Sequence, residues 1–276
     1  MLSFGVTYAD VALTGIMEST YTFNGKGKGI GAGLNGGSEF RLGGTEDLGN
    51  GLNADFNYAF IQDHNKGGDG IKGSGGPVKN YNSYVGLNGG FGSVRIGQQW
   101  TPLDNASWDN DSTGGVYTLS RGDQKQAAGS VTYISPNFAG FTLTAQGLNE
   151  KQDYAGFSLK YAAEAFSVAF AYHSENGQKD QKSLGGTYDF GVVKLFANGV
   201  MQSGQKDRFG VGLSAPVGDS TTVAVSYSEF GKDKNAAFLA KYSLSKRTAV
   251  YFLTKYDDLP PAASKSTNAI GVEHKF

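Results

Sequence analysis

The chain has 276 residues, a formal net charge of −1, no cysteine, 42 glycines and a mean hydropathy of −0.34. This length suits a large single domain, and the lack of cysteine excludes a disulfide framework and a thiolate metal site. A charge near zero argues against nucleic acid as a partner, because phosphate binding needs a basic surface.

The sequence contains no apolar run of about 18 residues, which excludes a membrane-spanning helix. A span built from strands remains possible, because each strand needs only about ten alternating residues. The first residues, MLSFGVTYAD, lack a basic segment followed by a long apolar core, so they are not an intact signal peptide. We expect that an export signal has been removed or replaced.

The rest of the chain favours strands, because Thr, Ser, Tyr and Phe are scattered through it and helical periodicity is almost absent. In TTVAVSYSEF, for example, Val223, Val225 and Tyr227 fall on one face and smaller residues fall on the other. The pattern predicts about sixteen strands, which cover roughly residues 11–23, 28–44, 52–62, 80–88, 93–100, 128–135, 141–149, 154–162, 166–173, 183–190, 192–202, 207–215, 221–230, 236–244, 247–257 and 266–276.

The connections between these strands are of two kinds. Segments such as EDLGNG, NGGFG and SPNFAG are short turns, whereas DHNKGGDGIKGSGGPVK and TPLDNASWDNDSTGGVYTLSRGDQKQ are long and polar. Transmembrane barrels have long loops at one end and short turns at the other. A soluble β-sandwich or β-solenoid also alternates, but this asymmetry favours an all-β transmembrane antiparallel barrel, with residues 1–276 as its single domain.

Charged residues follow the same alternation. The residues predicted to face lipid carry no formal charge, and they are Val11, Leu13, Phe40, Leu42, Ala54, Phe56, Val94, Ile96, Val131, Tyr133, Leu143, Phe157, Leu159, Val168, Phe170, Val193, Leu195, Phe209, Val211, Val223, Val225, Phe238, Ala240, Val250, Phe252, Ile270 and Val272. The inward positions between them hold Glu18, Glu39, Arg41, Asp55, Arg95, Lys160, Lys194, Arg208, Lys241, Lys255, Glu273 and Lys275. One Lys or Arg at the lipid midplane costs about 2–4 kcal/mol, so this sorting predicts a wet interior.

Aromatic residues gather towards the predicted strand ends, as in the interfacial girdles of membrane barrels. We expect Tyr21, Phe23, Tyr58, Phe60, Tyr172, Phe230 and Tyr256 at the loop end, and Phe141, Phe166, Phe190, Tyr242 and Phe276 at the turn end. The last segment, STNAIGVEHKF, alternates up to Phe276. We predict that it is the closing strand, which pairs with the first strand and leaves no open edge.

Five blocks of the sequence, GTEDLGNGLNADF, NSYVGLNGGFGSVRIGQQWTP, VTYISPNFAGF, YSLSKRTAVY and GVEHKF, resemble the general diffusion porins of β-proteobacteria of the neisserial and bordetellar type. The resemblance implies a sixteen-stranded, trimeric barrel in the bacterial outer membrane, surrounded by lipid and lipopolysaccharide. It implies passive passage of ions and small hydrophilic solutes. It also implies that the barrel-assembly machinery reads the terminal Phe276, and that the third outer loop folds into the lumen as a constriction.

This third outer loop maps to residues 101–127 and shows no evident secondary structure. Loops of that length are usually functional or disordered. With the nearby wall charges it predicts a constriction formed by Glu39, Arg41, Arg95, Asp104, Asp109, Asp111, Arg121 and Asp123. The predicted lumen wall includes Glu18, Asp55, Thr132 and Lys160.

The sequence departs from the family where relatives often carry arginine. Blocks that read GSR, GRQ and SxRY in relatives read here GSE with Glu39, GQQ with Gln98, and SVTY with Thr132. We expect Glu39 and Thr132 to face inward, and Gln98 to do so only if its strand is irregular near its end. Because charged side chains in a narrow constriction decide which ion sign passes, we predict a weakly selective or cation-leaning channel.

An enzyme would need a nucleophile, a base and a stabilising group that converge. The histidines are instead expected at different ends of the barrel, and no cofactor or metal site is expected; they are His64, His173 and His274. The glycine-rich GKGKGIGAGLNGG lacks the ending of a phosphate-binding loop, and we expect it to be an outer loop that runs into the second strand.

Two other functions remain open. A substrate-specific channel for sugars or small organic acids would line its path with aromatic residues, and Tyr84, Trp108 and Tyr251 are too dispersed in sequence to establish such a line. An adhesin or structural barrel with a plugged lumen would not conduct.

Overall fold

The computed structural model describes residues 10–23, 29–31, 33–34, 37–62, 78–108, 126–148, 153–258 and 265–276. These residues form seventeen strands and one short helix, α1 (Pro102–Trp108). The strands are β1 (Asp10–Thr22), β2 (Gly29–Gly31), β3 (Ser38–Gly49), β4 (Leu52–Gln62), β5 (Lys79–Gly89), β6 (Gly92–Trp100), β7 (Gln126–Ile134), β8 (Phe141–Leu148), β9 (Tyr154–Ala162), β10 (Phe166–Glu175), β11 (Gln181–Asp189), β12 (Lys194–Gln202), β13 (Arg208–Val217), β14 (Thr221–Phe230), β15 (Asp233–Ser243), β16 (Thr248–Asp258) and β17 (Lys265–Lys275).

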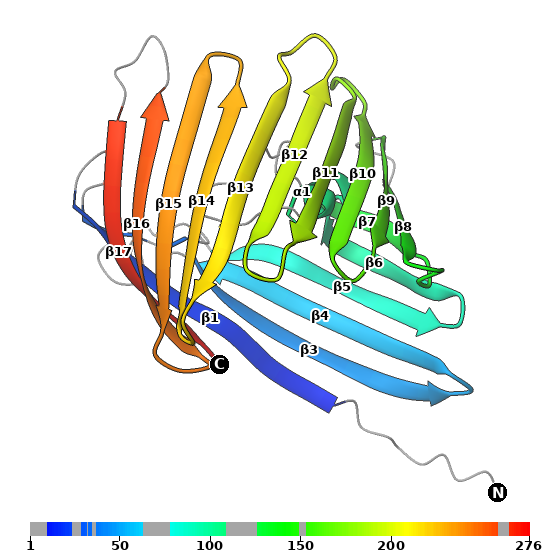
Figure 1. The fold of residues 1–276 in the computed structure, drawn as a ribbon. Helices are drawn as coiled ribbons and strands as arrows, with labels where there is room; N and C mark the ends of the chain where they lie inside the picture. Colours follow the sequence, from blue (N-terminus) through cyan, green and yellow to red (C-terminus); the bar gives the residue numbers. More distant parts are fainter. Residues whose placement is uncertain are drawn as a thin grey trace, which may run out of the picture.

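All the strands belong to one antiparallel sheet that closes on itself (Figure 1). From β3 onwards each strand pairs with the next in sequence, and β17 pairs back with β1. One edge of β1 pairs with β3 along its first residues and with the short β2 along its last, so β2 and β3 share one position in the wall. The predicted sixteen-stranded antiparallel barrel is therefore confirmed, with β2 as one extra strand.

The predicted second strand, 28–44, is wrong in its bounds. The structure divides this segment into β2, which ends at Gly31, and β3, which begins at Ser38 and continues to Gly49. Gly33, with a φ of +83°, and Leu34 form a turn between the two strands. Residues with a side chain rarely adopt such a φ, so the glycine is what allows the strand to break here.

The barrel closes at its last residue, as predicted. Gly15 and Phe276 exchange both backbone hydrogen bonds, each with an N···O distance of 3.1 Å. The Phe276 ring lies 5.6 Å from the ring of Phe40, which stacks on Phe60. A Cβ on Gly15 would lie 2.6 Å from the Phe276 ring, so glycine makes room for this aromatic. At this seam one row of rings links Phe276 with Phe60, although the sequence predicts these two residues in opposite girdles.

Register and exposure confirm the predicted division between the two faces of the sheet. Residues directly opposite each other share a face, and Val225 lies opposite Phe238, while Val250 lies opposite Val272. Large apolar side chains are exposed all round the outside, including Val85 at 65% and Ile96 at 60%. A protein surrounded by water does not carry so continuous an apolar surface, so the outer face fits a hydrocarbon environment.

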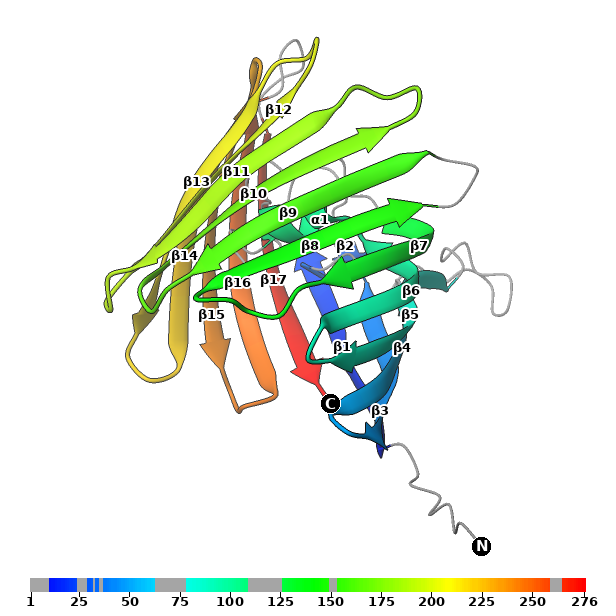
Figure 2. The same ribbon diagram turned by 90° about the vertical axis from the view of Figure 1, so that its right-hand side faces the viewer.

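The lengths of the connections differ less than predicted. At the loop end, β14 and β15 are joined by Gly231 and Lys232 alone, a connection as short as those at the turn end. The ribbon in Figure 2 shows α1 on the inner side of the wall formed by β8–β11, with which it is in contact. Among the residues placed by the structure, no helix is long and apolar enough to cross a membrane.

The two faces predict opposite effects for one substitution made at neighbouring residues of β8. Leu143, which lies opposite Leu159 on the outer face, should cost about 2–4 kcal/mol of stability when changed to arginine, because the charge enters hydrocarbon. The matched control Thr144→Arg places the same side chain on the inner face and should cost much less. Urea unfolding from phospholipid vesicles measures both, and equal losses would contradict the division.

Candidate functional site

The interior of the barrel is the candidate functional site, and α1 lies inside it. Leu103 and Ala106 of α1 form a buried cluster with Ala169 and Ala171 of β10. Ala169 and Ala171 alternate with the outward Phe170, so the cluster lies on the inner face of the wall. The predicted third outer loop therefore turns inward over residues 102–108, where small wall residues leave space for the helix.

The start of α1 is encoded locally. Thr101 caps the helix, since its Oγ1 accepts a hydrogen bond from the backbone N–H of Asp104 at 3.2 Å, and Pro102 occupies the first helical position. The prediction of no secondary structure in this loop is therefore wrong for residues 102–108, although the Thr-Pro-Leu-Asp sequence carries the signal. Asp104 is only 2% exposed, so its side chain is packed rather than open to the lumen.

One charge pair on the inner wall joins Asp55 of β4 to Arg95 of β6 across β5. Their Oδ2 and Nη2 atoms are 3.4 Å apart, and Asn88 donates a 2.9 Å hydrogen bond to Asp55 Oδ1. Gly86 lies between the two residues in the register, and a Cβ there would come within 2.3 Å of Asp55 Oδ1. The Arg95 guanidinium also lies 4.5 Å from the ring centre of Tyr84. The structure thus brings two predicted site residues together.

Two further ion pairs neutralise inward charges. Arg41 Nε donates to Glu39 Oε1 within β3, and Glu39 is 9% exposed. Lys241 of β15 and Glu273 of β17 approach with an Nζ–Oε1 distance of 2.5 Å. Sequence reasoning placed all four residues inward but did not pair them, because the partners of the second pair lie on strands separated by β16.

Glu18 lies on the inner wall at the seam and is 1% exposed. Its Oε1 accepts hydrogen bonds from the backbone N–H of Leu34 at 2.8 Å and from the hydroxyl of Tyr251 at 2.9 Å. Glu18 therefore lies on the inner side of the wall and is buried under its partners.

The predicted wall residues Thr132 and Lys160 lie on the strands near α1. Gln146 donates through Nε2 to Thr132 Oγ1 at 3.0 Å, and Thr132 is 4% exposed. Lys160 lines a cavity of about 380 Å³ between α1 and strands β8–β10, together with Asn105 and hydroxyl-bearing residues. These hydroxyls and the lysine give this part of the interior a polar surface.

Gln98 lies on the outer face of the sheet, because it stays in register with β5. The register of β6 with β7 shifts after Gly97, where Gln99 pairs with Ala127 and Gly97 with Ser130, but β6 keeps its register with β5 through Gln98. Gln98 lies opposite Ser83, on the face that carries Ile96. Its neighbour Gln99, at 6% exposure, is the inward glutamine.

Some predicted residues are not placed. Asp109, Asp111, Arg121, Asp123 and His64 lie outside the described residues, so their roles stay predictions.

The remaining two histidines are far apart in the fold. His173 lies 3.4 Å from Glu175 near the loop end of β10, and His274 bonds Thr248 at the turn end. Asp180 lies between β10 and β11 and accepts a 2.8 Å hydrogen bond from the hydroxyl of Tyr172 on β10, which holds the pKa of the Asp180 carboxyl below its ordinary range. Within the described ranges, no group of three or more His, Asp or Glu side chains is placed to hold a metal ion.

Comparison with known proteins agrees with this architecture. Residues 2–259 match a family model described as Gram-negative porin. Over 97% of the chain and 88% of the relative, the sequence is 29% identical to outer membrane porin protein 32 of Delftia acidovorans. Over 49% of the chain and 40% of the relative, it is 34% identical to the major outer membrane protein P.IB of Neisseria gonorrhoeae.

Among solved structures, an anion-selective porin from Comamonas acidovorans superposes with a TM-score of 0.79 at 23% sequence identity. The superposition covers 98% of this chain and 100% of that one. At this identity the likeness supports the barrel fold alone.

The seat of α1 generates a second prediction. Ala171→Leu adds bulk where Leu103 and Ala106 pack, so it should push α1 away from the wall into the lumen at a cost of about 1–3 kcal/mol. We expect a lower single-channel conductance and larger current fluctuations in planar bilayers. Ala197→Leu, which adds the same atoms to an exposed position of β12, should leave the current unchanged, and an equal effect there would contradict the assignment.

Proposed function

The chain belongs to the Gram-negative porin family, and we propose that this member is only weakly selective between anions and cations, or favours cations. It forms a water-filled channel across the bacterial outer membrane, through which ions and small hydrophilic solutes diffuse passively. The proposed selectivity depends on the charges that passing ions meet on the inner wall.

The observation that carries the proposal is the pairing of inward cations with carboxylates. Arg95 contacts Asp55, and Lys241 contacts Glu273. Two opposite charges a few ångströms apart act on a passing ion as a dipole, whose field falls off faster than that of a single charge. An unpaired charge 4 Å from an ion contributes about 1 kcal/mol in water and about 4 kcal/mol at an effective dielectric of 20, so pairing removes most of a large effect.

The sign of any remaining preference follows from Glu39 and Thr132. The family resemblance implies arginine in both blocks, and this chain has a buried carboxylate and a buried hydroxyl on the inner wall instead. Arg41 offsets Glu39 directly. Two cations that relatives use to attract anions are therefore missing, which favours weak or cation-leaning selectivity.

A substrate-specific channel has less support than general diffusion. Two of the three aromatics that could have formed a binding line are engaged by the wall: Tyr84 lies beneath Arg95, and Tyr251 is 4% exposed with its hydroxyl bonded to Glu18. Both rings are therefore engaged by neighbouring side chains, which does not favour a line of aromatic residues along the path. We propose no enzymatic role for this chain.

Partners follow from the outer surface. Its exposed apolar side chains suit membrane lipid, with lipopolysaccharide at the loop end. The family resemblance supports a homotrimer, and it supports recognition of Phe276 by the barrel-assembly machinery before the ring takes its place against Phe40.

The third prediction tests the role of Glu39. In a salt gradient across a planar bilayer, the native channel should show a reversal potential close to zero or on the cation side. Glu39→Arg should move it towards anion selectivity, because it changes the wall charge by two units beside Arg41. Glu164→Arg makes the same change in the exposed turn between β9 and β10 and should have little effect. A strong anion preference in the native channel would refute the proposal.

The fourth prediction tests the pairing itself. Asp55→Asn leaves Arg95 without its carboxylate and should shift the reversal potential towards anions, whereas Arg95→Gln should shift it towards cations. The double variant should return close to the native value, because both charges are removed together. Single variants that shift the reversal potential in the same direction, or a double variant far from the native value, would contradict the pairing.

A further inference from the structure

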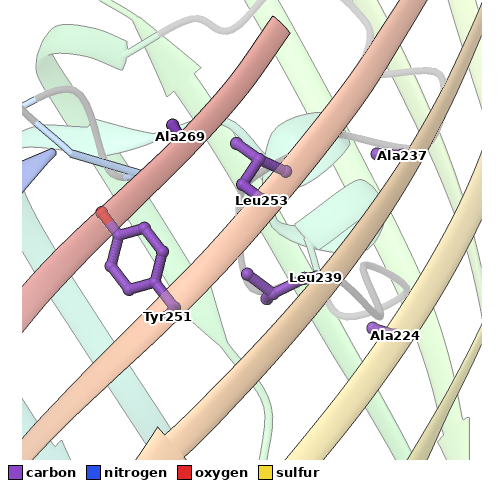
Figure 3. Close-up of a cluster of buried hydrophobic side chains, with 6 residues drawn as sticks. All are labelled: Ala224, Ala237, Leu239, Tyr251, Leu253 and Ala269. Atoms are coloured by element: carbon purple, nitrogen blue, oxygen red, sulfur yellow. The ribbon is translucent and has the colours of Figure 1, made fainter. Parts of the chain in front are cut away.

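Gly33 and Leu34 lie against the inner wall of the barrel, in a segment that the sequence predicts to be an outer loop running into the second strand, 28–44. The two residues follow β2 and form a turn. Leu34 packs against a buried apolar cluster on β14–β17, to which Leu239, Leu253 and Tyr251 belong. Figure 3 shows the cluster's side chains on these four neighbouring strands. A segment between two wall strands is thus turned towards the interior.

The turn is fixed to the wall by Glu18. The backbone N–H of Leu34 donates to Glu18 Oε1 at 2.8 Å. A Cβ on Gly33 would lie 2.3 Å from Glu18 Cγ, so the chain passes directly over this side chain. Ser38, the first residue of β3, accepts a 3.2 Å hydrogen bond from the backbone N–H of Glu18 through its Oγ. Leu34 and Ser38 are therefore both hydrogen-bonded to the same residue of β1.

Tyr251 holds the Glu18 carboxylate in place from the other side. Its hydroxyl donates to Glu18 Oε1 at 2.9 Å and also contacts Thr20 Oγ1. To reach them the ring crosses β17 at Gly271, where a Cβ would lie 2.1 Å from the Tyr251 ring (Figure 3). The glycine therefore lets a residue of β16 reach β1 and fix the acceptor for Leu34.

Leu34 packs on an apolar cluster, which is unusual on the inner wall of a water-filled channel. Inward positions facing open water are expected to be polar. Here Leu239 and Leu253 occupy such positions and are 7% and 5% exposed. Ala224, Ala237 and Ala269 complete the cluster around them. Covering this patch removes apolar surface from water and so stabilises the inward position of Leu34.

This apolar cluster faces α1 across the barrel. The helix contacts β8–β11, whereas Leu34 is held by β1 and the cluster on β14–β17. In a closed barrel these two sets of strands form opposite walls, as the ring of pairings requires. Two segments on opposite walls narrow a lumen more effectively than one.

We propose that Gly33 and Leu34 form a second element of the channel constriction, and that Glu18 is the positioning residue that holds it against the wall. The proposal rests on the proposed function, because it concerns the width of that channel. It assigns to this element the exclusion of larger uncharged polar solutes. Glu18 acts through the turn and needs an acceptor oxygen for this role, not a negative charge.

The test uses the absence of cysteine from the native chain. Leu34→Cys is reconstituted in bilayers and treated with a membrane-impermeant thiol reagent, alone and combined with Glu18→Ala or Glu18→Gln. We expect labelling about tenfold faster in the Glu18→Ala background, because the hydrogen bond from the Leu34 N–H to a charged group is lost. Glu18→Gln keeps the acceptor oxygen and should stay close to the native rate.

The channel readout uses the same changes without the cysteine. Glu18→Ala should raise the conductance and admit larger polyethylene glycols, and Glu18→Gln should do neither. Glu164→Ala, which removes an exposed carboxylate in a turn, is the matched control and should leave both unchanged. If Glu18→Ala does not fold, Leu34→Asp, which places a charge against the apolar cluster, should produce the same release.

The outcomes separate the two proposals. Native protein that conducts, with unchanged labelling and polymer exclusion in folded Glu18→Ala or Leu34→Asp, overturns the second constriction element and leaves the channel intact. Equal effects of Glu18→Gln and Glu18→Ala overturn the positioning role, because charge would then be the cause. Native protein without conductance overturns the channel function, while protected Leu34→Cys would still report the held turn.

Discussion

The fold depends on one constraint: in hydrocarbon, every backbone N–H and C=O of the wall must find its partner within the sheet. The seam between β1 and β17 satisfies it, because it joins the two edges that the fifteen other pairings, from β1–β3 to β16–β17, would leave open among the described strands. Once the sheet is closed, side-chain alternation has a fixed meaning, since one face meets lipid and the other meets the lumen. The exposed Val85 and Ile96 and the buried Glu18 are consequences of that division.

Closure also crowds the inner face, because side chains on a concave surface converge. Small residues at some inward positions relieve this crowding. Gly86 lets Asp55 and Arg95 meet across β5, and Gly271 lets Tyr251 cross β17. In each case a glycine on the middle strand allows contact between residues two strands apart, at a separation that ordinary cross-strand pairs do not span. The polar network of the lumen therefore depends on these glycines as well as on its charged residues.

Alternation explains what could be read from the sequence and what could not. It places Glu39, Asp55, Arg95 and Glu273 inward, because period two needs no knowledge of neighbouring strands. Ion pairs between strands that are not adjacent, such as Lys241 with Glu273, depend on the register of a strand between them and carry no local signal. The helix α1 has a local signal in Thr101 and Pro102, although strand alternation alone does not indicate it. The inward turn at Leu34 was missed because glycine-rich composition suggests a loop without indicating its direction.

Charge and width are then controlled by different parts of the same wall. Pairing of Arg95 with Asp55 and of Lys241 with Glu273 should weaken the field along the lumen, and under the proposed function we expect ion sign to have little influence on passage there. We expect width to be set by the segments that fold inward, which are held by apolar contacts of Leu103 on β10 and Leu34 on β14–β17 and, for Leu34, also by its hydrogen bond to Glu18. Glu18 illustrates this separation of charge from width, because its carboxylate accepts a hydrogen bond from the turn at Leu34 and is buried away from passing ions. A channel built in this way sorts solutes by size before it sorts them by charge.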